Sequence, residues 1–88
     1  MRVLFEASFE KDLRKVKDLS IKLRIKNHIE EIKLASSVKQ IKNIKKLKEY
    51  DTYYRIRIGD FRIGLEIIED KVILTRFLHR KNIYKYFP

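Results

Sequence analysis

The stretch YYRIRIGDFRIGLEII, residues 53–68, decides the fold of this chain. Apolar residues recur at every second position on both sides of a central Gly-Asp pair. A period of two is typical of a strand with one buried face, and a Gly-Asp pair suits a tight turn. The stretch therefore predicts a β-hairpin in which Arg55 and Arg57 point away from the face that carries Ile56 and Ile58.

The hairpin is expected to continue into a third strand and a folded tail. Glu69-Asp70 supplies a second turn, and residues 72–78 are apolar enough on both faces to lie centrally in a sheet. Residues 79–88 begin polar and end aromatic, so we expect the tail to fold back across the sheet. Residues 53–78 thus predict a three-stranded meander.

The first half of the chain predicts a strand and two helices. Residues 1–5 are rich in Val, Leu and Phe and predict a short strand, after which Ser8 is expected to cap a helix. Asp18 and Ser20 offer the start of a second helix, which should end before Ser36-Ser37. Apolar residues recur at helical spacing in each: Phe9, Leu13 and Val16, then Ile21, Ile25, Ile29, Ile32 and Ala35.

The order of these elements indicates an α+β architecture. We expect a single domain over residues 1–88, in which a short N-terminal strand and a two-helix hairpin accompany a largely antiparallel four-stranded sheet. The helices should cover one face of that sheet. The lysine-rich residues 38–48 are expected to form a loop leading into a short strand. One sheet face remains free for function.

Charge is the strongest signal in the composition. The chain has 22 Lys and Arg against 12 Asp and Glu, a formal net charge of +10, which attracts polyanions. No apolar run approaches the roughly 18 residues of a membrane-spanning helix, and the start does not resemble a signal peptide. We therefore expect a cytoplasmic protein that does not contact membranes. The absence of Cys, of a Gly-rich phosphate loop and of metal-ligand spacing predicts neither a metal nor another cofactor.

Arginines in the second half of the chain are candidates for phosphate binding, because a guanidinium can grip phosphate through two parallel hydrogen bonds. Arg55 and Arg57 share a strand face, Arg62 can lie across from them, and Arg80 follows the third strand. The four could converge on one patch. Solvated positions on the outer face of an antiparallel sheet would give the same pattern.

An imidazole, a guanidinium and a phenol lie close together in His79, Arg80 and Tyr84. Cleavage of a phosphodiester by a ribose 2′-hydroxyl needs a proton acceptor, a proton donor and cations around the phosphorus. His79 is the candidate acid or base, since histidine titrates near neutrality, although a structural role fits it as well. His28 lies beside the apolar stripe of the second helix and is expected to pack there. The tyrosines could stack on unpaired bases.

Together, YRIRIGDFRI (residues 54–63) and HRKNIY (residues 79–84) resemble the RelE branch of the RelE/ParE toxin superfamily over essentially the whole chain. The resemblance implies a toxin of a type II toxin-antitoxin system. It implies a metal-free endoribonuclease that depends on the ribosome, cleaves mRNA in the decoding site by 2′-hydroxyl attack and so inhibits translation. It also implies inhibition by an antitoxin.

The same resemblance assigns residue roles. It places Arg62 and Arg80 at the phosphate, Arg55 and Arg57 at the RNA backbone and transition-state charge, and leaves His79 as the better general base, because arginine deprotonates too poorly. The functional tail tyrosine matches Tyr84 by motif and Tyr86 by distance from the arginine. The full set of expected site residues is Arg57, Arg62, His79, Arg80 and Tyr84 as catalytic, with Arg55, Lys45, Lys46, Lys81 and Tyr86 as RNA-binding.

Two other functions share these features. The ParE branch has the same fold and resembles gyrase poisons, and a non-catalytic RNA-binding module would use the same patch to position phosphates. The complete cationic set favours the RelE branch. The expected partners are the ribosome with its mRNA and an acidic antitoxin, partly disordered when free, that folds along the basic surface.

Overall fold

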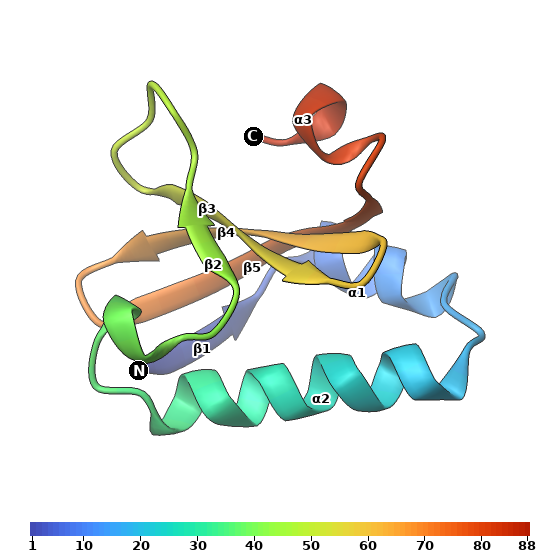
Figure 1. Cartoon of the computed structure of the whole chain (residues 1–88), viewed down its shortest axis with the longest axis horizontal. Helices are drawn as coiled ribbons and strands as arrows, with labels where there is room; N and C mark the ends of the chain where they lie inside the picture. Colours follow the sequence, from blue (N-terminus) through green and yellow to red (C-terminus); the bar gives the residue numbers. More distant parts are fainter.

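The computed structural model describes all 88 residues and shows one five-stranded sheet with helices on both faces (Figure 1). The strand order is β1-β5-β4-β3-β2. The elements are β1 Arg2–Phe5, α1 Ala7–Arg14, α2 Leu19–Leu34, a 3-10 turn Val38–Gln40, β2 Ile44–Lys46, β3 Tyr53–Ile58, β4 Phe61–Ile68, β5 Lys71–His79 and α3 Ile83–Tyr86. None of the helices combines the length and apolar character that a membrane crossing requires.

The hairpin predicted from residues 53–68 is confirmed. β3 and β4 pair antiparallel, with Ile56 opposite Ile63 and Arg57 opposite Arg62. Gly59 makes the turn with a φ of 58°, a left-handed conformation that glycine adopts without steric cost. β5 then pairs with β4 and lies between β4 and β1, so the prediction of a central third strand is also confirmed.

The predicted α+β architecture with a largely antiparallel sheet is confirmed, but the sheet has five strands and not the expected four. β1 pairs parallel with β5, with Val3 opposite Val72, and β2 pairs antiparallel with β3, with Lys45 opposite Arg55. The short lysine-rich segment 44–46 therefore joins the sheet as its edge strand. Lysine is a common means of protecting such an edge from pairing with other chains.

The start of α1 also differs from the expectation. Glu6, not Ser8, is the N-cap residue of α1, and the Ser8 hydroxyl instead donates to the carbonyl of Thr75 (2.6 Å). Asp12 accepts the backbone N–H of Phe77 (2.9 Å) further along the same strand. Both side chains form hydrogen bonds with backbone groups of β5 at the edge that β1 no longer covers. Ser8 therefore lies within α1, where its hydroxyl reaches this edge, and not at the N-cap position.

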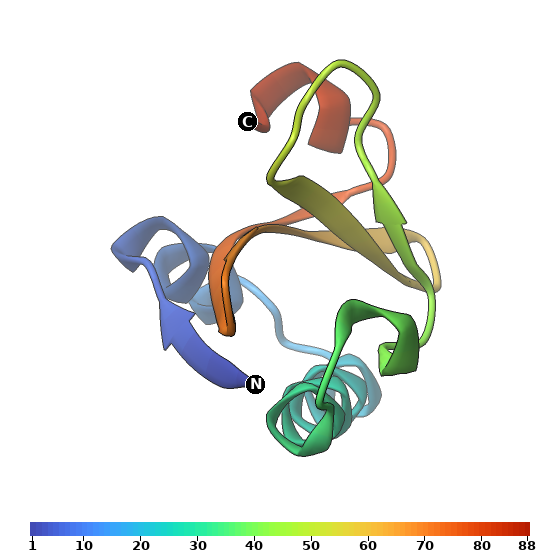
Figure 2. The ribbon, with the colours of Figure 1, turned by 90° about the vertical axis from the view of Figure 1, so that its left-hand side faces the viewer.

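The second helix begins as predicted, since Asp18 caps α2 by accepting from the backbone N–H groups of Ser20 and Ile21. α1 and α2 bury their apolar stripes on the same face of the sheet, where Phe9 of α1 and Ile32 of α2 are fully buried. Figure 2 shows α2 on one side of the sheet and α3 on the other.

The tail folds back over the sheet as predicted. Its residues form a second, smaller core on the face opposite α1 and α2, made of Leu47, Ile83 and Phe87 with Tyr53 and Leu78 packed against them. The two cores leave the middle of this second face to polar residues, and the candidate site lies there.

Candidate nucleic-acid interface

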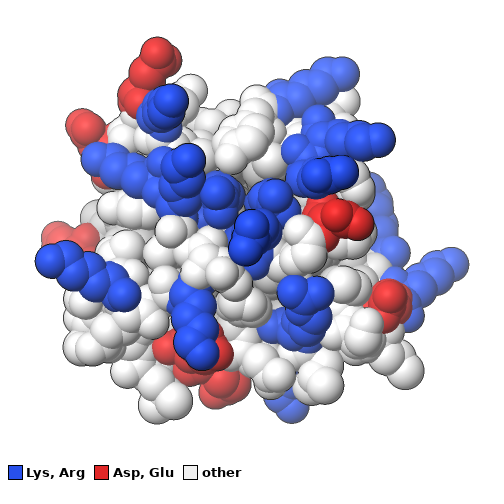
Figure 3. All heavy atoms as spheres, in the orientation of Figure 1, with Lys and Arg blue, Asp and Glu red and all other residues white.

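Strand alternation places three arginines on the sheet face opposite the long helices. Ile56 and Ile58 of β3 are fully buried in the main core, so the alternate residues Arg55 and Arg57 lie on the other face. Arg62 of β4 is directly opposite Arg57 and shares its face. We call the set Arg55, Arg57, Arg62 and Arg80 the arginine face. Figure 3 shows the molecule in the orientation of Figure 1, and lysine and arginine side chains form a band over the region of β2, β3 and β4.

Arg62 lies at the centre of the arginine face. Burial, followed by repulsion from Arg55, Arg57 and Arg80, lowers the pKa of its guanidinium, while Tyr84 acts in the opposite direction. The four arginines therefore lie close enough to one another to interact electrostatically, and Tyr84 lies near Arg62. Arg62 Nη1 donates to the carbonyls of Gly59 and Phe61, both at 2.9 Å, which fixes the guanidinium. The structure thus brings together the four arginines and one tyrosine that the sequence singled out.

Two of the flanking arginines are held in different ways. Arg55 donates from Nη1 to the carbonyl of Asn43 (3.2 Å), and its buried Nε has no partner. The backbone of Arg80 donates to the carbonyl of Asp60 (2.8 Å), but its side chain stays exposed and its Nε lies 3.9 Å from the Asp60 carboxylate. Arg80 can therefore turn toward a ligand, while Arg55 keeps a hydrogen-bond donor unused.

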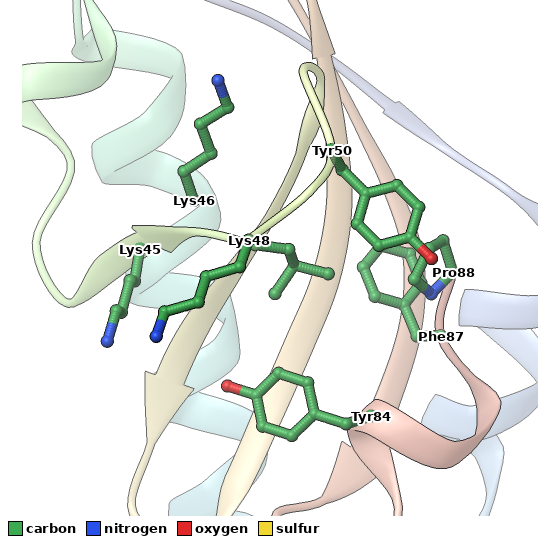
Figure 4. A pocket seen from close by; sticks show the side chains of 8 residues that line it. Lys45, Lys46, Lys48, Tyr50, Tyr84, Phe87 and Pro88 are labelled. Atoms are coloured by element: carbon green, nitrogen blue, oxygen red, sulfur yellow. The ribbon is translucent and has the colours of Figure 1, made fainter.

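A pocket of about 370 Å³ adjoins this face, between β2 and the C-terminal tail. It is lined by Lys45, Lys46, Leu47, Lys48, Tyr50, Tyr84, Phe87 and Pro88. Tyr84 projects from α3 with its hydroxyl toward the side on which Lys45 and Lys48 lie (Figure 4). Tyr86 does not line the pocket. The ammonium nitrogen of Lys85 lies over its ring, 5.5 Å from the ring centroid. Of the two candidate tyrosines, Tyr84 is the one beside the arginines.

His79 is not brought to the arginine face. It lies opposite Phe61 on β4, and Phe61 packs against the main core on the helix-covered side. The ring of His79 meets that of Phe61 edge-on at 5.5 Å, and its Nδ1 accepts the backbone N–H of Lys81 (3.1 Å). The imidazole therefore orders the turn that follows β5, on the far side of the sheet from Arg62.

The predicted lysines are divided as well. Lys45 pairs with Arg55 and extends the arginine face. Lys46 also lines the pocket, but its side chain points away from Lys45 in Figure 4. Lys81 is exposed in the turn before α3. His28 was expected to pack beside the apolar stripe of the second helix. It is half-buried on α2, as predicted.

Four pocket residues were missed by the sequence analysis, namely Leu47, Lys48, Phe87 and Pro88, and Tyr50 was considered there only as one of several tyrosines that could stack on bases. Tyr50 stands three residues before β3 in a segment without periodicity, so no strand pattern indicates its direction. The aromatic end of the tail was the one available signal, since it predicted a return across the sheet.

The chemistry of this face follows from its residues. Four guanidiniums on one face suit a phosphate with growing negative charge, because arginine stays protonated and bonds two oxygens at once. No histidine lies among them. The structure contains no group of three or more His, Cys, Asp or Glu residues placed to hold a metal ion.

Comparisons with known proteins agree on the family of this chain. The sequence model of the ParE toxin of the type II toxin-antitoxin system parDE matches residues 3–84. The chain is 51% identical to Toxin RelE3 of Methanocaldococcus jannaschii over the full length of both proteins. It is 35% identical to the Putative toxin RelE1 of the same organism, covering 82% of this chain and 80% of that protein.

Solved structures agree. The toxin in a crystal structure of a RelB-RelE antitoxin-toxin complex from Methanococcus jannaschii superposes with a TM-score of 0.82 at 48% identity, covering 97% of this chain and 99% of that one. The intact RelBE complex of E. coli shares the fold, with a TM-score of 0.69 at 17% identity, covering 89% of this chain and 94% of that one. The chain belongs to the RelE/ParE superfamily of type II toxin-antitoxin toxins, and within it to the RelE branch.

Proposed function

We propose that this toxin is a ribosome-dependent endoribonuclease that cleaves mRNA in the ribosomal A site, in the cytoplasm, and thereby inhibits translation. The observation that carries the proposal is the cluster of Arg55, Arg57 and Arg80 around the half-buried Arg62, with Tyr84 beside it. A fixed group of donors aimed at developing charge is the form of catalysis that contributes most in many enzymes.

The proposed reaction is an internal transfer within the RNA. The ribose 2′-oxygen attacks the adjacent phosphorus, the bond from phosphorus to the 5′-oxygen breaks, and the products are a 2′,3′-cyclic phosphate and a 5′-hydroxyl. Arg62 and Arg80 stabilise the phosphoryl oxygens and the leaving oxygen. Arg55 and Arg57 hold the backbone, and Tyr84 stacks on a base.

Proton transfer in this scheme does not use His79, which lies across the sheet from Arg62. We assign removal of the 2′-hydroxyl proton to solvent hydroxide, and protonation of the leaving oxygen to water ordered by the arginines. The local positive charge lowers the pKa of a bound hydroxyl and attracts hydroxide. The same charge repels divalent cations, which supports a reaction independent of metal.

Primer extension on a defined message tests the proposal. The toxin is incubated with the message alone and with ribosomes programmed by it, each with and without EDTA pretreatment of the toxin. New breaks within codons, only on ribosomes and unchanged by pretreatment, are the expected result. Breaks on free RNA, or none on ribosomes that bind the toxin, would refute it.

Two related functions are separated by further measurements. Arg80→Ala should abolish cleavage and weaken ribosome binding only slightly, whereas an equal loss of both would indicate a binding module. A ParE-like activity would appear as inhibition of gyrase supercoiling by a toxin that leaves mRNA intact.

A cognate antitoxin is also part of the proposal, supported by the RelB partner of the related RelE. A groove between α1 and α2 is lined by Leu13, Ile25 and Ile29 with Lys22 and Lys26 at its margins, together with Arg14. Such a groove suits an amphipathic acidic helix. The association rate should fall as salt is raised, and a rate indifferent to salt would contradict electrostatic capture.

A further inference from the structure

A second pocket lies on the helix-covered side of the sheet, and the proposed function does not use it. Its volume of about 360 Å³ falls within the range of small-ligand sites. Its walls come from the end of α1 and its connection to α2 (residues 12–18), from Ile21 of α2, from Phe61 of β4 and from the end of β5. Figure 1 shows this connection at the same end of the molecule as the β3–β4 turn. We call this hollow the loop pocket.

The floor of the loop pocket is apolar and ordered. Phe77 is buried in the main core, and the ring of Phe61 stacks on it with centroids 5.1 Å apart. The ring of His79 meets Phe61 edge-on and extends this aromatic surface. Val16 and Ile21 pack against the same core. An apolar ligand would therefore bury its surface against rings that are already fixed, with little loss of side-chain entropy.

The two carboxylates of the loop pocket already have partners. Asp12 accepts from Arg76 Nε and Nη2 at 2.8 and 3.3 Å, and from the N–H of Phe77 at 2.9 Å. Asp18 accepts from the hydroxyl of Ser20 at 2.7 Å and from its backbone N–H at 2.8 Å, at the start of α2. Both negative charges are thus stabilised within the protein itself.

The free polar groups of the loop pocket are donors. The three ion pairs of the structure involve neither Lys15 nor Lys17. His79 accepts the backbone N–H of Lys81 at Nδ1, so the proton of the neutral imidazole lies on Nε2, which forms no hydrogen bond. Two ammoniums and one N–H therefore line the pocket without a partner.

A smaller hollow of about 210 Å³, with no apolar residue in its walls, adjoins the loop pocket. The two share Asp12, Lys15 and Arg76, and the smaller one adds Lys11, which also takes part in no ion pair. Free positive charge is thus concentrated on the side of α1. We expect the acid group of a ligand to lie at this side and its apolar body to lie over the aromatic floor.

We propose that the loop pocket binds a small organic carboxylate, whose acid group lies between Lys15 and Lys17 and whose apolar body, one or two rings in size, packs on Phe61. The Nε2–H of His79 supplies a further donor. A peptide would instead place backbone N–H and C=O groups against rings that cannot bond them, so a small molecule is favoured. The site goes beyond the proposed cleavage of RNA, because it lies across the sheet from Arg62 and contains no residue of the arginine face.

Binding can be measured on the toxin alone, without ribosomes. Naphthalene-2-carboxylate is the probe, and naphthalene-2-carboxamide is a neutral probe of the same shape. Each is titrated into isotope-labelled toxin, and the ring signals of Phe61 and His79 are followed by NMR together with the amide signal of Lys81, whose hydrogen bond ends on His79.

The carboxylate should shift all three signals and bind about threefold or more tightly than the carboxamide, since two exposed ion pairs contribute modestly. Equal affinity of the two probes would refute the role of the lysines. Shifts confined to the arginine face, or to the groove between α1 and α2, would overturn the site.

Two lysine variants make the test specific. Lys17→Gln should weaken binding of the carboxylate by about twofold or more, the effect of one exposed ion pair. Lys26→Gln is the matched control, because Lys26 is an exposed lysine that lines the groove between α1 and α2 and not the loop pocket. Its affinity should equal that of the unaltered toxin. Equal weakening by both variants would show that binding follows net charge alone, which contradicts the proposal.

A glutamate-rich peptide tests the other class of occupant. It should leave the ring signals of Phe61 and His79 in place at the same ionic strength. If the peptide shifts these signals and the naphthalene carboxylate does not, the loop pocket is a protein-binding site and the proposal fails.

Discussion

The ring of Phe87 packs directly against Gly64 of β4, so closely that a β-carbon on Gly64 would lie 2.7 Å from it. No such carbon fits unless the ring moves, and the ring is part of the pocket wall. Gly64 lies directly opposite Arg55, in the middle of the face that carries the site. The absence of a side chain at this position therefore lets the tail close over the sheet.

Gly64→Ala should displace the tail. We expect the free energy of unfolding to fall by about 1–3 kcal/mol, the usual cost of overpacking. Chemical denaturation measures this effect. Phe87→Leu in the same chain should recover part of the loss, because the two residues are in contact. Strictly additive effects of the two substitutions would show that the contact is not the cause.

Arg62→Lys should slow ribosome-dependent cleavage by about 100-fold or more, the effect of removing one oriented donor from a site of developing charge. Lysine keeps the charge but lacks the planar fork of donors. Rates come from single-turnover primer extension, and Arg14→Lys on the exposed surface of α1 is the matched control. If Arg62→Lys stays within about threefold of the unaltered toxin, the central role of this guanidinium is refuted.

His79→Gln should retain most of the cleavage activity, because the imidazole contacts Phe61 and the Lys81 backbone rather than the arginines. With hydroxide as the proton acceptor, the logarithm of the single-turnover rate should rise linearly with pH and show no inflection near the ordinary histidine pKa. A rate plateau above pH 7 that disappears in His79→Gln would instead make His79 the general base.

His28 should make the fold sensitive to mild acid. Burial lowers the pKa of His28 below its ordinary value of 6.5, with further lowering from Arg24 and Lys42 and an opposing effect of Glu31. Since the unfolded chain takes up this proton first, stability is lost as pH falls through 6.5 toward the folded pKa.

Denaturation at pH 7.5 and at pH 5.5 tests the role of His28. His28→Gln should show a smaller loss of unfolding free energy between the two conditions than the unaltered chain, and Lys26→Gln, an exposed neighbour on α2, should show the same loss. Equal losses in all three proteins would mean that His28 is not the responsible group.

Asp12→Ala should destabilise the chain by about 2 kcal/mol or more, since a buried carboxylate that accepts from charged and backbone donors is removed. Asp12 is 6% exposed and accepts from Arg76 Nε at 2.8 Å as well as from the N–H of Phe77. Asp12→Asn keeps an acceptor for Phe77 and should lose less. Equal losses in thermal or chemical denaturation would show that the Phe77 hydrogen bond contributes little.

The repetitive parts of the fold could be predicted from the sequence, because period and register are local properties. Ile56 and Ile58 fix which way Arg55 and Arg57 point, and the Gly59 turn then brings Arg62 across from them. Asp18 likewise marks the start of α2 through its own neighbours.

What the sequence did not reveal depends on contacts between distant segments. His79 is adjacent to Arg80, yet strand alternation and pairing with Phe61 place it across the sheet. Ser8 is a good capping residue, but a carbonyl on β5 takes its hydroxyl. Tyr50 becomes part of a pocket only because the tail returns over Gly64.

The most direct test of the central claim uses two messages that differ by one atom. One carries ribose and the other 2′-deoxyribose at the nucleotide before the cut, and each is placed on ribosomes with the toxin. The account predicts cleavage of the ribose message, with a 2′,3′-cyclic phosphate and a 5′-hydroxyl at the new ends, and an intact deoxy message. Cleavage of the deoxy message at the same position would contradict it.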